Sequence, residues 1–172
     1  ATLDCWGGYP PSPPDCPYGE MLDGWPFNET NWLSWKGHAP TVVSNVECVP
    51  SWSSNALQLD STNAALLQYP GVETNGSTNI TCDYGTVRFW FKPNWGGTNL
   101  DGTGPGTWAR LLEVGAWTTN ASNGWWSLYL NPEGTELRFS AQAGGVETNY
   151  LTADIAWASN AWHQLVLTYT PS

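Results

Sequence analysis

The sequence predicts an all-β fold, an antiparallel β-sandwich, on three observations. Apolar residues recur at every second position in several short segments, the period of a strand with one buried face. No window of about a dozen residues shows the period of an amphipathic helix. Turn-forming residues separate the segments, and the chain holds 18 Gly and 13 Pro. With 172 residues, of which 41% are hydrophobic, the chain can bury one sizeable core.

Seven segments meet the criteria for a strand. They are residues 56–59, 65–69, 86–92, 110–116, 125–130, 136–142 and 163–169. Alternation assigns the side chains of each strand to a core face and an outward face. The residues expected on the core face include Val87, Phe89, Phe91, Trp126, Leu128, Leu130, Leu137, Phe139 and Ala141. The same alternation places Trp90, Trp125 and Tyr129 outward, with Arg88 on the face of Trp90.

These outward aromatic residues form a candidate contact surface with three interpretations. Sugar rings could stack on the surface, a second subunit could cover it, or the chain's own tryptophan-rich N-terminal segment could cover it. Sugar binding also needs polar groups that fix hydroxyls, and Arg88, Arg138 and Asn131 are candidates.

An N-terminal arm over residues 1–22 is expected to precede the domain at 23–172. Five prolines lie between Tyr9 and Tyr18, which excludes both a helix and a central strand there and favours polyproline II. The arm is interpreted either as a docking strap or O-glycosylated stalk, or as a terminus held only by its disulfide.

Four cysteines predict disulfides and an extracellular or cell-surface location. They are Cys5, Cys16, Cys48 and Cys82, an even number without C-x-x-C spacing or paired histidines, which argues against zinc. Of three possible connectivities, the pairs Cys5–Cys16 and Cys48–Cys82 are favoured because the first closes a proline-stiffened loop and the second could join two strands. Four free buried thiols are the alternative.

Four Asn-x-Ser/Thr triplets are candidate N-glycosylation sites, at Asn28, Asn75, Asn79 and Asn120. Each lies in a stretch rich in Asn, Thr, Ser or Gly, where a turn is expected and a glycan has room. Four triplets exceed the number expected by chance only mildly, so the count alone does not establish glycosylation. Glycosylation also depends on a host that performs it.

The charge balance excludes two classes of partner. The net charge is −10, and the five basic residues do not cluster, so no surface is expected that follows the phosphates of a nucleic acid or an anionic membrane. No apolar run approaches the roughly 18 residues that cross a bilayer, so membrane insertion is not expected either.

The order of the strand motifs resembles a laminin G-like, concanavalin A-like jelly roll. The motifs are NALQLD at 55–60, ALLQYP at 65–70, GTVRFWFKP at 85–93, LLEVG at 111–115, WSLYLN at 126–131, ELRF at 136–139 and WHQLVLTY at 162–169. The resemblance covers residues 53–172 and implies a jelly-roll connection of the strands. In that family, a hairpin and closing strands normally follow the last motif, so the jelly roll is expected to be completed by downstream chain or by another subunit.

No enzymatic site is expected. The glycosidases that share this fold carry a Glu-x-Asp-x-x-Glu strand, which is absent here. Glu133 and Glu136 are separated by a turn and Glu113 stands alone, so no acid and base pair forms. His38 and His163 are the two histidines, and the sequence has no nucleophile-elbow motif, so a catalytic triad has no support. His163 is expected to be structural.

No cofactor is expected, and the evidence for a metal is weak. Calcium is common in related folds, and Asp101, Asp154 or the carbonyls of residues 99–106 are candidate ligands. None of them follows a spacing signature for calcium.

The expected function is therefore that of a non-enzymatic extracellular structural or adhesive module. It would be a subunit of a surface or matrix assembly, built by self-association or with neighbouring subunits, and strand complementation would extend it into a filament. Residues 1–52 are the candidate donor of the missing strands. A carbohydrate-binding, lectin-like module is the first alternative, and a glycosidase-related domain is the second.

The disulfide assignment makes the first testable prediction. Peptide mapping without reduction should recover Cys5 linked to Cys16 and Cys48 linked to Cys82, because the first pair closes a proline-stiffened loop and the second could join two strands. A cross-linked pair such as Cys16 with Cys48 would contradict the assignment, as would four alkylatable thiols in the unreduced protein.

Overall fold

The all-β class is confirmed by the structure, a computed structural model. It describes residues 2–4, 21–59, 64–81, 84–115, 125–143 and 145–170. These residues contain eleven strands and one short 3₁₀ helix, Thr98–Leu100, and their antiparallel sheets are consistent with a β-sandwich. None of the described residues forms a helix long and apolar enough to span a bilayer.

The chain divides into two compact units that interleave along the sequence. The first unit comprises Ala1–Ile80, Val87–Phe91 and His163–Leu167, and the second comprises Thr81–Thr86, Lys92–Trp162 and Thr168–Ser172. Strands β6 (Gly85–Lys92) and β11 (His163–Tyr169) therefore contribute residues to both units.

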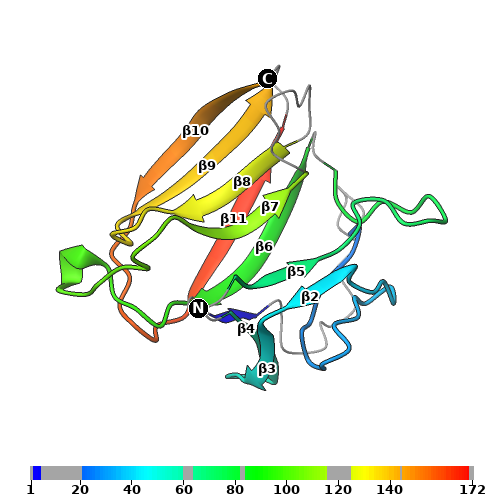
Figure 1. Ribbon diagram of the computed structural model, residues 1–172, viewed down its shortest axis with the longest axis horizontal. Coiled ribbons are helices and arrows are strands. Elements are labelled where there is room, and N and C mark those ends of the chain that lie inside the picture. Colours follow the sequence, from blue (N-terminus) through cyan, green and yellow to red (C-terminus); the bar gives the residue numbers. More distant parts are fainter. Residues whose placement is uncertain are drawn as a thin grey trace. The chain divides into compact units, whose positions relative to one another are not determined.

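The first unit holds most of a five-stranded sheet in the order β11-β6-β1-β4-β3, together with a two-stranded sheet of β2 and β5 (Figure 1). The remaining strands of these sheets are β1 (Thr2–Asp4), β2 (Val42–Ser44), β3 (Val46–Pro50), β4 (Asn55–Leu59) and β5 (Leu66–Gln68). Strand β1 belongs to the expected arm, yet it pairs antiparallel with β4 of the same chain, with Leu3 opposite Leu57.

The second unit is built on a four-stranded antiparallel sheet in the order β10-β9-β8-β7 (Figure 1). Its strands are β7 (Ala109–Val114), β8 (Trp125–Leu130), β9 (Glu136–Ala143) and β10 (Val146–Asp154). Strand β8 is central in this sheet, while β7 and β10 form its edges.

All seven expected strands are present, with ends that differ by at most two residues. The structure adds four strands that the periodicity did not indicate, namely β1, β2, β3 and β10. Strand β10 begins within the segment 145–149, whose sequence GVETN also occurs at 71–75, where it lies in a bend, a turn and an isolated bridge. The two copies thus have different structures, because the cross-strand partner and not the local sequence determines them.

Trp126 is central to the core of the second unit. It is 2% exposed and lies 4.9 Å from Tyr169 and 5.6 Å from Phe139, measured between ring centroids. Leu128 and Leu130, on the same face of β8, are also buried. This arrangement confirms the core face that alternation predicted for β8.

A buried carboxylate organises the segment before β2 in the first unit. The Asp23 side chain is fully buried, and its Oδ1 accepts hydrogen bonds from the backbone N–H groups of Gly24 and Lys36. Its Oδ2 lies 2.7 Å from His38 Nδ1. Because these donors satisfy the carboxylate, a chain segment without regular strands keeps a defined path here.

Candidate functional site

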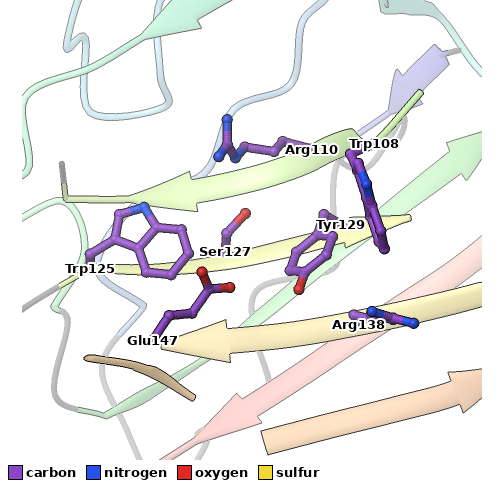
Figure 2. A pocket seen from close by; sticks show the side chains of 7 residues that line it. All are labelled: Trp108, Arg110, Trp125, Ser127, Tyr129, Arg138 and Glu147. Atoms are coloured by element: carbon purple, nitrogen blue, oxygen red, sulfur yellow. The ribbon is translucent and has the colours of Figure 1, made fainter. Parts of the chain in front are cut away.

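The candidate site is a pocket of about 390 Å³ in the second unit (Figure 2). The side chains that line it combine three aromatic rings with charged and hydroxyl groups. They are Trp108, Arg110, Trp125, Ser127, Tyr129, Arg138 and Glu147. All except Trp108 come from the four strands of the sheet, and Trp108 directly precedes β7.

The register of the sheet brings these residues together on the face opposite Trp126. Tyr129 on β8 lies opposite Arg110 of β7 and opposite Arg138 of β9. Trp125 and Glu147 are paired to the same residue of β9 from opposite sides. The pocket is thus a row of side chains that all four strands supply at matching positions.

A bulge in β7 determines where Arg110 points. The register shifts between Arg110, opposite Tyr129, and Leu112, opposite Leu128. Strict alternation would place Arg110 and Leu112 on one face, whereas the extra residue lets Arg110 face the pocket and Leu112 face the core. The bulge also puts Arg110 and Glu113 on the same face, where Arg110 Nε lies 2.7 Å from Glu113 Oε2.

Arg138 is held in place by a carboxylate and an aromatic ring. Its Nε and Nη2 donate to Glu136 Oε2 at 2.9 and 2.5 Å, and its guanidinium lies 4.9 Å from the centroid of the Trp108 ring. The hydrogen bond to Glu136 is the main cause that raises the pKa of Arg138 above its ordinary value, so the side chain remains a cation. Trp108 also meets Tyr129 edge to face at 5.6 Å.

Trp125 lies at the other end of the pocket and is 3% exposed. Its buried indole N–H has no hydrogen-bond acceptor among the described residues. Leaving such a donor unsatisfied costs about 1–3 kcal/mol. Ser127, also fully buried, donates to the backbone carbonyl of Leu112 at 3.3 Å.

The predicted aromatic surface is divided between the two units. Trp125 and Tyr129 share a face as expected, although Trp125 is buried and not exposed. Trp90 and Arg88 are in the first unit, where Trp90 packs against Trp52 with their centroids 5.6 Å apart. The prediction of one surface shared by Trp90, Trp125 and Tyr129 was based on the outward face of each strand alone. The face of a strand does not show which other strands lie beside it.

Asn131, a predicted sugar ligand, instead supports the turn between β8 and β9. Its Oδ1 accepts from the backbone N–H groups of Thr135 and Glu136, and its Nδ2 donates to Thr135 Oγ1. Because Asn131 is 6% exposed and makes all of these bonds, its role is structural.

Sequence reasoning missed four residues of the pocket: Trp108, Arg110, Ser127 and Glu147. Glu147 lies on β10, and the strand was detectable because Val146, Thr148, Tyr150 and Thr152 are residue types that favour strands. Arg110 was hidden by the bulge. No local signal identified Trp108, because its importance depends on contacts with Tyr129 and Arg138.

The remaining candidate residues occupy separate places. Asp101 is exposed at the end of the 3₁₀ helix and Asp154 is exposed at the end of β10. The described parts of the chain bring together no group of three His, Cys, Asp or Glu side chains suited to a metal. Burial lowers the pKa of His163 at the start of β11, which favours a neutral imidazole.

Cys48 is the one cysteine within the described residues, and its Sγ lies 3.7 Å from the carbonyl oxygen of Phe27. Cys5, Cys16 and Cys82 lie outside the described residues, so the disulfide assignment stays a prediction.

The chain matches no known protein-family model, no curated protein and no solved structure.

The candidate glycosylation sites differ in exposure. Asn75 is exposed, and its Oδ1 accepts a hydrogen bond from the backbone N–H of Ser77 in a local turn. Asn79 is 3% exposed, and its Nδ2 donates to the Pro70 carbonyl at 2.9 Å and to Glu73 at 2.5 Å. Asn28 is half-buried, and Asn120 lies outside the described residues.

We therefore expect the folded protein, produced in a host that glycosylates Asn-x-Ser/Thr, to carry a glycan on Asn75 and none on Asn79. A glycan at Asn79 would replace an Nδ2 hydrogen and break the bonds that this amide makes. Enzymatic deglycosylation followed by peptide mass spectrometry converts each occupied Asn to Asp. Conversion at Asn79 in the soluble, cooperatively folding fraction would contradict the expectation.

Proposed function

We propose that this protein is a non-enzymatic, extracellular carbohydrate-binding module whose site is the pocket on the β7–β10 sheet. The observation that carries the proposal is the meeting of three aromatic rings with charged and hydroxyl groups in one pocket. A sugar has apolar C–H faces that pack on aromatic rings and hydroxyls that need donors and acceptors, and the pocket offers both.

The aromatic groups are arranged along the pocket. Trp108 is 53% exposed, so part of its ring remains accessible although Arg138 and Tyr129 contact it. Trp125 is buried at the opposite end, where its ring lines the pocket. Rigid rings bind with little loss of conformational entropy, which supports recognition of a flat, weakly hydrophobic ligand.

The polar groups favour hydroxyls and supply no catalytic pair. Arg110 and Arg138 are donors, and Glu147 is an acceptor. Among the residues that the structure describes, Glu147 is the one carboxylate that lines the pocket, and hydrolysis of a glycosidic bond needs two carboxylates placed across the bond. Binding without hydrolysis is therefore the proposal.

Replacing Trp108 tests this proposal. We expect Trp108→Ala to weaken binding to glycans that the wild type retains by about tenfold, because an aromatic contact is lost. Trp52→Ala, which removes an indole that is 58% exposed and outside the pocket lining, should bind like the wild type. The measurement is retention on an array of neutral and acidic oligosaccharides, followed by calorimetry. Retention of no glycan by the wild type, or equal losses in both variants, would refute the proposal.

Strand exchange is a second candidate function, and β1 favours it. Thr2–Asp4 lie between β4 and β6 in the five-stranded sheet, although those neighbours begin at Asn55 and Gly85. A short strand that is distant in sequence from its partners can pair equally with the same strands of another copy. We propose that exchange of β1 links copies of the chain into an adhesive assembly.

Leu3→Pro tests this exchange. Proline cannot donate a backbone hydrogen bond and is excluded from the middle of a sheet, so the variant should lose the higher oligomers that the wild type forms. Met21→Pro, at an exposed position outside the described strands, is the matched control and should assemble normally. Size-exclusion chromatography with light scattering and negative-stain microscopy report the assembly. A wild type that stays monomeric with a cooperative melt would exclude the exchange.

A further inference from the structure

The charges in the pocket are not equally available to a ligand. Each pocket arginine already has a carboxylate partner: Arg110 lies 2.7 Å from Glu113, and Arg138 donates twice to Glu136. An arginine that is paired in this way has less residual attraction for a second anion than a free arginine has. The two arginines are therefore donors whose charge is largely balanced.

Glu147 is the exception. It is exposed on β10 and makes no ion pair with any residue that the structure describes. In Figure 2 its carboxylate points toward the space between Trp125 and Tyr129. The pocket and its bonded glutamates thus retain one uncompensated negative charge, and the chain as a whole carries a net charge of −10.

We propose that the pocket selects uncharged, hydroxyl-rich glycans and that Glu147 is the residue that excludes uronic and sulfated sugars. The inference rests on the proposed carbohydrate-binding function. A carboxylate accepts hydrogen bonds from two neighbouring hydroxyls, so an uncharged sugar satisfies Glu147. A ligand carboxylate or sulfate at the same position brings two negative charges together and offers no proton to share.

Trp125 adds no positive charge that would compensate an acidic ligand. Its indole is neutral, and its N–H is buried without an acceptor among the described residues.

Matched glycan pairs test the selectivity. The probes are cello-oligosaccharides with and without oxidation of C6 to the uronate, methyl-esterified and free oligogalacturonides, and chitin and chitosan oligomers. In every pair that binds, we expect the uncharged member to bind at least about fivefold more tightly at low ionic strength than the acidic member, the factor for like charges about 4 Å apart in water. Chitosan is the charge-reversed control and should not be disfavoured relative to chitin, because an added cation meets the one uncompensated negative charge, on Glu147.

Two variants assign the effect to Glu147. Glu147→Gln keeps the shape of the side chain and should reduce the preference over acidic glycans to within about twofold. Glu133→Gln removes the same charge from an exposed turn outside the pocket lining and should keep the wild-type preference. Circular dichroism and thermal melts verify that both variants fold.

The possible results distinguish this inference from the proposed function. Equal or tighter binding of the acidic members by the wild type overturns the selectivity and leaves carbohydrate binding intact. An unchanged preference in Glu147→Gln overturns the role of Glu147. Binding of none of the probes overturns the proposed function and this inference together.

Discussion

The pleat of β8 is the constraint on which the second unit depends. Successive side chains of a strand point to opposite faces, so the adjacent Trp125 and Trp126 cannot enter the same layer. Trp126 packs against Phe139 and Tyr169 in the core, whereas Trp125 lines the pocket on the other face. Both faces of this central strand are nearly fully buried, so moving the register by one residue would disrupt the core and the pocket together.

Two bulges adapt the edges of this sheet to the pocket. The bulge in β7 keeps Leu112 over the core while Arg110 and Glu113 face the pocket side. In β10 the register shifts between Asn149, opposite Ser140, and Leu151, opposite Phe139. The extra residue lets the side chains before and after the shift match the two faces of β9. A bulge also increases the local twist of an edge strand, which discourages the unwanted addition of further strands there.

The two units use buried polar groups in different ways. In the first unit the buried Asp23 carboxylate is satisfied by His38 and two backbone N–H groups, so its burial is compatible with a stable loop. In the second unit the Trp125 N–H is equally buried and is not satisfied by any described residue. A satisfied buried group fixes a local structure, whereas an unsatisfied buried donor costs stability.

The sequence by itself determined the all-β class, the position of seven strands and the core face of β8, because the period of two and the turn residues act over short distances. It also placed Trp125, Tyr129 and Arg138 on the face away from the core, where all three line the pocket. Only the tertiary structure decided that β1 lies between β4 and β6, and that Trp108 and Glu147 join the pocket. Strand neighbours, bulges and aromatic contacts are set by pairing between distant segments, which local periodicity does not encode.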